Sequence, residues 1–379
     1  MRVGVVAGEA SGDALGVTLM KAIRTRYPDA TFEGIAGPGM QSIGAKSLFP
    51  MDRLSVRGYV EVLKALPGLL WLRRTLARHF LEHPPDLFVG IDAPDFNLAL
   101  EKRLKRAGIP TLHMVAPTVW AWRPGRLPAI RESVDGILSI FPFERPLFEA
   151  AGIPITDIGH PLAQQIPETV DRVAARQALL PGKTGPVVAL LPGSRVSELE
   201  FHAPLFVQVA ALLQSRFPLI HFLVPMVDAR TRVLFENALA GGLQTPAVTL
   251  LDGHAWEALS ASDVALVASG TATLEAALLK CPMVITYRLS ALTAWMVRRR
   301  GLSQFVGLPN IILGRSVVPE LIQENATPHA LADAVAALLN DPERRISMVQ
   351  SFQSIHHLLR ANSQQGILEG VARVLRHAP

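Results

Sequence analysis

Cysteine is nearly absent from this chain of 379 residues, which contains Cys281 alone. A single cysteine excludes an internal disulfide and any metal site built from a cysteine cluster. Charged residues are also scarce, at 18% of the chain against about 25% in an average globular protein. Because apolar residues make up 49%, the composition excludes a disordered chain and predicts well-packed domains with unusually apolar surfaces.

Long apolar runs are missing as well. No run approaches the roughly 18 residues that a membrane-spanning helix needs, although the mean hydropathy is positive at +0.29. The N-terminus begins directly with an expected strand and carries no separate export segment. We therefore expect a cytoplasmic protein.

Aromatic residues make up only 6% of the chain, and no basic stretch is interleaved with them. This pattern argues against a nucleic-acid partner, which usually binds clustered cations and stacking rings. The net charge of +5 and the pI near 9.6 nevertheless favour an anionic partner. The sequence thus predicts a phosphorylated metabolite or an anionic lipid as ligand.

Short apolar runs alternate with helical stretches along the chain, as in doubly wound parallel sheets. Strands are expected at residues 2–7, 31–36, 86–91, 110–115, 136–140, 155–158, 187–191, 219–224, 247–251, 264–268 and 283–286. A proline-rich stretch near residues 160–185 interrupts the pattern, and the length exceeds what one core usually supports. We predict an α/β fold with two Rossmann-like domains, residues 1–170 and 171–345, followed by C-terminal helices in residues 346–379.

Two strand-to-helix turns in the second half predict a diphosphate site. The first follows residues 187–191, where helix-start amides without intrahelical acceptors attract anions. Ser194 adds a hydroxyl donor there and Arg195 a permanently charged guanidinium. The second turn follows residues 264–268 and carries the small donors Ser269, Gly270, Thr271 and Thr273.

Two carboxylates stand near expected strand ends. Glu275, one turn into a helix, either accepts hydrogen bonds from a ribose diol or offsets the helix dipole, and we favour the ribose role. Asp92 ends an apolar strand, where a carboxylate is costly unless paired or functional, so it is a candidate general base. The alternative is a cap for the next turn, a role that suits Asp95 better. His113 and His160 also lie at strand ends and are expected to be structural.

A glycine-rich turn at residues 8–13 precedes an expected helix at residues 14–26. It lacks the spacing of a dinucleotide-binding motif and the lysine of a P-loop. Glu9, Ser11 and Asp13 lie where open α/β sheets hold their ligands. The alternative, slightly favoured on residue type, is a capped helix start with Ser11 or Asp13 as the cap.

Other chemistries lack their motifs: the chain has no G-x-S-x-G and no H-E-x-x-H, and it requires neither metal nor cofactor. Turns from two facing Rossmann-like domains would converge on a cleft. Residues 66–74 and 292–300 each place leucine and tryptophan beside arginines. These segments resemble membrane-interface helices, although core helices with cationic ends are an equal alternative.

Seven motifs, VAGEASGD, VGIDAPDFN, VWAWR, LLPGSR, ASGTATLE, KCPMV and LPN, occur in the order found in the lipid A disaccharide synthase family. The chain resembles these bacterial GT-B glycosyltransferases along nearly its whole length. The resemblance implies transfer of diacylglucosamine from UDP-diacylglucosamine to lipid X, with inversion. It also implies a peripheral enzyme on the cytoplasmic face of the inner membrane and a homodimer with exchanged C-terminal segments.

The resemblance also implies roles for individual residues. Asp92 is similar to the catalytic base, Arg195 to a diphosphate ligand, and Glu275 to a ribose ligand. Asn310 in LPN is similar to a further donor-site residue. Glu9, Ser11 and Asp13 correspond to acceptor-side residues.

Two alternatives remain open from the sequence. Another GT-B enzyme, such as a lipid-linked GlcNAc transferase or a UDP-sugar epimerase, would share the sheets and the ribose glutamate. A two-domain binding protein without chemistry is a different class, against which the placement of Asp92 and the lack of an export segment argue.

Overall fold

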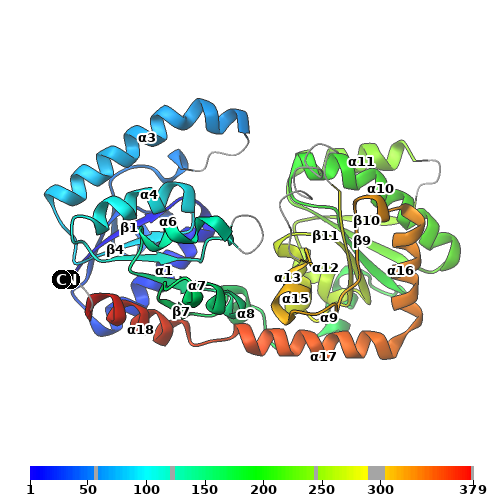
Figure 1. The fold of residues 1–379 in the computed structure, drawn as a ribbon. Coiled ribbons are helices and arrows are strands. Elements are labelled where there is room, and N and C mark those ends of the chain that lie inside the picture. Colours follow the sequence, from blue (N-terminus) through cyan, green and yellow to red (C-terminus); the bar gives the residue numbers. More distant parts are fainter. Residues whose placement is uncertain (55–58, 120–123, 243–245, 289–303, 377–379) are drawn as a thin grey trace. The chain divides into compact units, whose positions relative to one another are not determined.

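The computed structural model describes residues 1–54, 59–119, 124–242, 246–288 and 304–376, which Figure 1 traces. The chain divides into two compact units. The first combines Met1–Pro161 with Leu359–Pro379, and the second comprises Leu162–Leu358. The end of the chain therefore belongs to the same unit as its beginning.

In the first unit, seven described strands form one sheet in the order β3-β2-β1-β4-β5-β6-β7, with parallel neighbours throughout. They are β1 (Arg2–Ala7), β2 (Thr31–Ile35), β3 (Ala45–Ser47), β4 (Leu87–Ile91), β5 (Thr111–Met114), β6 (Gly136–Ser139) and β7 (Ile155–Asp157). The central strands are buried along almost their whole length, as parallel strands covered by helices should be. The strands expected from the sequence in this half are confirmed, and β3 is an addition.

Helices cover both faces of this sheet. They are α1 (Ala10–Arg26), α2 (Pro38–Ser42), α3 (Tyr59–Glu82), α4 (Pro94–Lys105), α6 (Leu127–Arg131), α7 (Arg145–Ala150) and α18 (Ser363–Arg376). Apolar residues of α1 and α18 form one core with the sheet, and residues of α3 and α4 form a second core. The first unit is thus a three-layer α/β structure.

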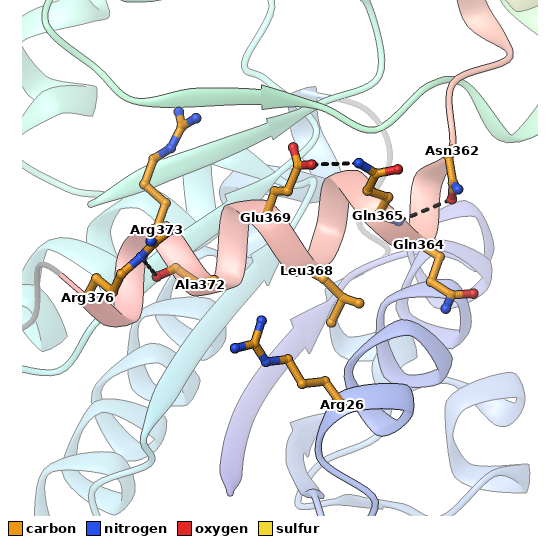
Figure 2. Close-up of a pocket in the computed structure, with 9 residues that line it drawn as sticks. All are labelled: Arg26, Asn362, Gln364, Gln365, Leu368, Glu369, Ala372, Arg373 and Arg376. Atoms are coloured by element: carbon orange, nitrogen blue, oxygen red, sulfur yellow. Dashed lines mark hydrogen bonds between the residues drawn. The ribbon is translucent and has the colours of Figure 1, made fainter.

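Helix α18 packs closely on strands far from it in the sequence. A side chain at Gly370 would place its Cβ 2.4 Å from Leu138 Cδ2 of β6, so the glycine permits this approach. Figure 2 shows Arg26 of α1 facing α18 across a surface hollow of about 520 Å³. The hollow is lined by Arg26, Asn362, Gln364, Gln365, Leu368, Glu369, Ala372, Arg373 and Arg376.

In the second unit, six described strands are ordered β10-β9-β8-β11-β12-β13, again with parallel neighbours. They are β8 (Val187–Leu191), β9 (His221–Met226), β10 (Val248–Asp252), β11 (Val264–Ala268), β12 (Met283–Tyr287) and β13 (Glu320–Ile322). The strand order reverses direction between β8 and β11, which is where doubly wound sheets bind ligands. The predicted strands of this half are confirmed, and β13 is an addition.

The helices of the second unit follow the same alternating plan. They are α8 (Pro161–Gln165), α9 (Arg172–Leu179), α10 (Val196–Arg216), α11 (Ala229–Ala240), α12 (Ala255–Ala261), α13 (Thr271–Leu278), α15 (Leu308–Leu313), α16 (Pro328–Asn340) and α17 (Pro342–Leu359). Helix α10 is long and apolar enough to cross a membrane, but half of its most apolar 18-residue stretch is buried inside the protein. Because it packs against α11 and α16, we assign it to the core.

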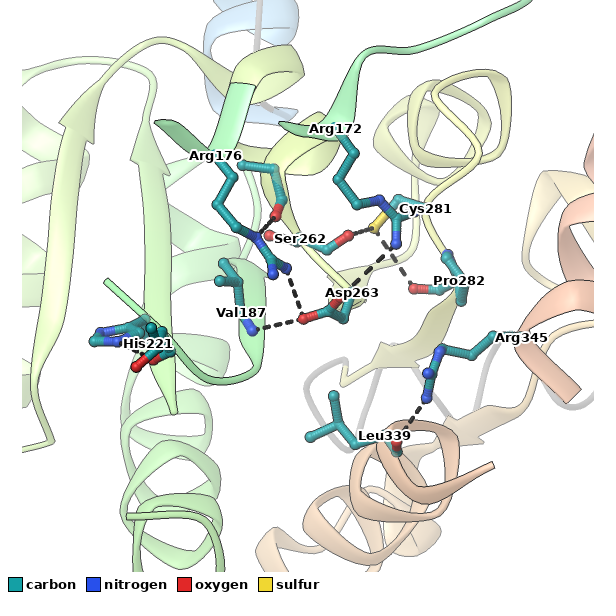
Figure 3. Close-up of polar contacts among 12 residues, drawn as sticks. Arg172, Arg176, Val187, His221, Ser262, Asp263, Cys281, Pro282, Leu339 and Arg345 are labelled. Carbon is teal, nitrogen blue, oxygen red and sulfur yellow. Dashed lines mark hydrogen bonds and ion pairs between the residues drawn. The ribbon is translucent and has the colours of Figure 1, made fainter. Parts of the chain in front are cut away.

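The Asp263 side chain joins helix α9 to strand β8 (Figure 3). One carboxylate oxygen accepts the Val187 amide of β8 at 2.9 Å and the Arg176 guanidinium of α9 at 2.7 Å. Arg172 pairs with the other oxygen at 3.8 Å. Helix α9 is thereby fixed next to the first residues of β8 and β11. Cys281, drawn nearby, is buried as expected.

Candidate functional site

A cavity of about 380 Å³ opens in the second unit at the carboxyl ends of β8 and β11. It lies at the point where the strand order reverses. Its lining residues are Leu191, Gly193, Ser194, Arg195, Glu198, Pro225, Val227, Ala255, Ala268, Ser269, Gly270, Thr271, Ala272, Glu275 and Tyr287. We call this cavity the switch-point pocket. The starts of α10 and α13 both border it, so helix-start amides from two helices face the same space.

Most of the predicted donor-side residues meet in this pocket, from two turns that are separated in the sequence. They are Ser194, Arg195, Ser269, Gly270, Thr271 and Glu275. The Arg195 side chain is 73% exposed. The two turns thus line one cavity, and diphosphate binding there stays a prediction.

Two predicted donor-side residues do not line the pocket. The hydroxyl of Thr273 donates to the Gly270 carbonyl at 2.8 Å and accepts the Leu308 amide at 3.3 Å, so it joins α13 to α15. Asn310 is fully buried. Both residues have structural contacts in place of a pocket-facing position.

Asn310 uses both ends of its amide. Its nitrogen donates to the Val318 carbonyl and to Glu320 Oε1, each at 2.8 Å. Its oxygen accepts the amides of Val317 at 2.7 Å and Val318 at 2.9 Å. These contacts fix the segment before β13, and they leave the side chain no capacity for a ligand in this conformation.

Glu198, for which we predicted no role, lines the switch-point pocket. Its Oε2 accepts the amides of Ser194 at 3.0 Å and Arg195 at 3.3 Å. Its Oε1 lies 3.3 Å from the Arg195 guanidinium. A glutamate three residues after a helix N-cap commonly folds back in this way, and that spacing was the available signal.

Tyr287, at the end of β12, was also missed. It lines the same pocket as Glu198. Burial raises the pKa of its hydroxyl above the ordinary value, and the nearby Glu198 carboxylate raises it further. Tyr287 therefore stays a neutral hydrogen-bond donor beside the carboxylate at physiological pH.

Asp92 in the first unit occupies a strained turn. Its φ angle is 53° and that of Ala93 is 44°, so two successive residues with side chains adopt the left-handed conformation. The register pairs Ala7 of β1 with Ile91 of β4, which places the turns after both strands side by side. The Asp92 side chain is exposed, so the expected burial penalty was wrong, and strain marks this position instead.

Hydrogen bonds from the Asn97 side chain stabilise this turn. Its buried side-chain nitrogen donates to the Asp92 carbonyl at 2.8 Å and to the Val6 carbonyl at 3.3 Å. Asp95 is not a cap: it forms an ion pair with Arg126 at 2.7 Å, and 85% of its side chain is exposed. The alternative of an aspartate cap on α4 is therefore wrong for Asp95, and the N-cap position of α4 is Ala93.

Behind this turn, His113 is fully buried and its Nδ1 lies 2.8 Å from Glu101 Oε1. His160 is also buried, its ring packs against Phe141 at 5.2 Å, and burial lowers its pKa from 6.5 to about 4. Both histidines have the structural settings that the sequence suggested.

The helix that carries the predicted acceptor-side residues begins earlier than predicted. Helix α1 begins at Ala10, not at residue 14, and its N-cap Glu9 makes no side-chain cap. Glu9 and Ser11 are exposed near the end of β1, on the edge that carries Asp92. Asp13 is buried, and its carboxylate accepts the Gly39 and Met40 amides at 2.7 and 3.0 Å. It thus caps α2 and does not cap α1.

The apolar segment at residues 66–74 lies on α3. Trp71 is 53% exposed and Leu66 is 44% exposed, whereas Leu72 is buried in the core. Arg74 is exposed one turn after Trp71. The second such segment, including Trp295 and Met296, and most of the VWAWR motif lie outside the described residues.

Within the described ranges, no group of three or more histidine, cysteine, aspartate or glutamate side chains is arranged to hold a metal ion. Among the described residues that line the switch-point pocket, the cation is Arg195, whose guanidinium lies 3.3 Å from Glu198.

Residues 3–369 match the family model of the lipid-A-disaccharide synthetases. A lipid-A-disaccharide synthase of Methylobacillus flagellatus is 46% identical over 376 residues, covering 99% of both chains. That of Thiobacillus denitrificans is 49% identical over 374 residues, covering 99% of this chain and 100% of the relative.

Solved structures with the same fold are far less similar in sequence. UDP-GlcNAc 2-epimerase of Neisseria meningitidis, bound to UDP-GlcNAc, superposes with a TM-score of 0.61 at 13% identity, covering 98% of this chain and 100% of the epimerase. A glycotransferase of kitacinnamycin gives 0.57 at 17% identity, covering 100% and 99%. These neighbours place the chain in the GT-B fold.

Proposed function

Because the chain belongs to the lipid-A-disaccharide synthetase family and is a glycosyltransferase, we propose that it transfers 2,3-diacylglucosamine from its UDP ester to 2,3-diacylglucosamine 1-phosphate, lipid X. The products are lipid A disaccharide 1-phosphate and UDP. The strongest structural support is the switch-point pocket, where two helix starts and Arg195 face one cavity of about 380 Å³. Such a cavity suits a nucleoside diphosphate.

In the donor complex, the diphosphate lies against the amides at the starts of α10 and α13 and against Arg195. Ser269 and Thr271 border the same space, and Glu275 accepts hydrogen bonds from the ribose diol. The solved UDP-GlcNAc 2-epimerase and Anabaena HepE, the latter in complex with UDP and glucose, share this fold. Thr273 and Asn310 are buried, and in this proposal they act through their contacts with Gly270, Leu308 and the segment before β13.

Asp92 acts as the general base in this proposal. It removes the proton of the acceptor's primary hydroxyl while that oxygen attacks the anomeric carbon from the face opposite UDP. The new carbon–oxygen bond forms as the bond to the β-phosphate oxygen breaks, so the configuration inverts. Arg195 and the helix amides stabilise the charge on the departing UDP, the role of preorganised donors in transfer reactions.

The lipid substrates suggest a peripheral protein on the cytoplasmic face of the inner membrane. Exposed Leu66 and Trp71, with Arg74 beside them, form a surface on α3 that suits acyl chains and anionic head groups. A homodimer with exchanged C-terminal segments belongs to the same proposal.

The decisive experiment incubates purified protein with UDP-diacylglucosamine and lipid X and resolves the products by mass. Asp92→Asn should lower the turnover about a hundred-fold to ten-thousand-fold, the usual loss on removing a positioned base. Asp95→Asn is the matched control, because it makes the same change three residues away in an exposed side chain. Near-normal turnover by folded Asp92→Asn would reject the role of Asp92.

The same assay separates a second GT-B activity. An epimerase would consume the nucleotide sugar without lipid X, whereas the proposed transferase releases UDP only when lipid X is present. Acceptor-independent conversion of the donor would therefore contradict the proposal.

A further inference from the structure

The groups proposed to bind the donor diphosphate already hold an anion. Oε2 of Glu198 accepts the Ser194 amide at 3.0 Å and the Arg195 amide at 3.3 Å, and Oε1 pairs with the Arg195 guanidinium at 3.3 Å. Only 15% of the Glu198 side chain is exposed. A carboxylate therefore already accepts hydrogen bonds from the groups that we assign to the donor phosphate.

The backbone is shaped for this arrangement. Gly193 has a φ of +122°, and a Cβ there would lie 2.7 Å from Glu198 Cβ and 2.8 Å from Oε2. The turn thus requires glycine for Glu198 to fold back over it. Tyr287 lines the same pocket, and the Glu198 carboxylate contributes to the raised pKa of its hydroxyl.

We infer that Glu198 is an internal substitute for the donor phosphate, which UDP-sugar displaces on binding and which returns when UDP leaves. This inference rests on the proposed function. Carboxylate and phosphate accept the same charge-assisted hydrogen bonds, and the Ser194 and Arg195 amides each have a single hydrogen, which Glu198 already accepts. Displacement of Glu198 therefore weakens donor binding, and its return favours the release of UDP.

A purely structural cap would behave differently. A glutamate at this position needs only the N-cap amide to complete a capping box. Here it also takes the Ser194 amide and the Arg195 side chain, the two other groups assigned to the diphosphate. Glutamine can complete the same box, so a neutral variant keeps the cap and loses the competing charge.

The test compares UDP binding to the full-length wild type, Glu198→Gln and Glu198→Asp by calorimetry, with UDP release rates from stopped-flow displacement. Glu198→Gln removes the charge at constant shape, and Glu198→Asp keeps the charge but shortens its reach. We expect both variants to bind UDP more tightly, Glu198→Gln by about tenfold, and to release it more slowly. Glu200→Gln is the control, since it removes the same charge from an exposed site on α10.

Unchanged or weaker UDP binding by Glu198→Gln and Glu198→Asp, with wild-type binding and disaccharide synthesis intact, would overturn the inference alone. Equal tightening in Glu200→Gln would overturn it too, because net charge would then be the cause. A wild type that binds no UDP would overturn the proposed function together with this inference. Melting temperatures of the variants monitor folding.

Discussion

His160 makes the stability of the first unit depend on pH. It follows β7, is only 8% exposed, and packs its ring on Phe141 at a centroid distance of 5.2 Å. Burial lowers its pKa from 6.5 to about 4, because the surroundings disfavour the charged imidazolium. The folded unit therefore binds this proton less readily than the unfolded chain does.

The sign follows from that difference. Between pH 6.5 and about 4 the unfolded chain binds more protons than the folded unit, so the free energy of unfolding falls as the pH falls. Well above pH 6.5 both states are neutral at this residue, so its contribution is constant. The lowered pKa of His160 corresponds to a loss of about 3 kcal/mol on going from pH 7 to pH 4.

The measurement is urea unfolding at pH values from 7 to 4, followed by pulsed hydrogen exchange and mass spectrometry. Peptides from β5 and β6 report on the first unit, and peptides from β8 and β11 report on the second. His160→Gln cannot titrate, so its first unit should lose about 3 kcal/mol less than the wild type over this range. His83→Gln, at an exposed position on the same unit, should keep the wild-type slope. Identical pH slopes for His160→Gln and wild type would refute the reasoning.

Two further predictions concern buried amides. Asn310→Ala leaves the Val317 and Val318 amides without their acceptor, so the second unit should lose about 3–5 kcal/mol of unfolding free energy in urea, with little change in the UDP affinity of folded protein. A stable variant with weakened UDP binding would instead favour a ligand role. Asn97→Ala frees the Asp92 carbonyl, and a misplaced base should lower kcat by up to about a hundredfold with KM values near normal. An unchanged kcat in steady-state assays would contradict this.

The sequence predicted the fold where burial alone decides the residue pattern. Parallel strands covered on both faces are continuous apolar runs, so β1, β8 and β11 could be located from composition. The edge strands β3 and β13 are three residues long and carry Lys46 and Glu320, so no apolar run announces them. Their pairing depends on neighbouring strands already in place.

The position of a site residue could be predicted where it directly follows a strand. It could not be predicted where contacts with residues distant in the sequence determine it. Arg195 and Glu275 could be assigned to one edge because the carboxyl ends of parallel strands share that edge. Asp13 could not be assigned, because its partners are the amides of Gly39 and Met40, which arrive with α2. Asn310 similarly depends on the course of the chain at Val317.

The two units use different residues in the turn that follows a central strand. In the second, Gly193 turns the chain at φ +122° without strain, which suits a turn that presents backbone amides. In the first, Asp92 and Ala93 turn it in the left-handed region at a cost of about 1–2 kcal/mol per residue. Val115, at the end of the adjacent β5, adds a third positive φ of 77° on that edge. Glycine at position 92 would relieve strain but remove the carboxylate. A side chain retained at that cost is expected where the chemistry needs it, and an amide turn needs none.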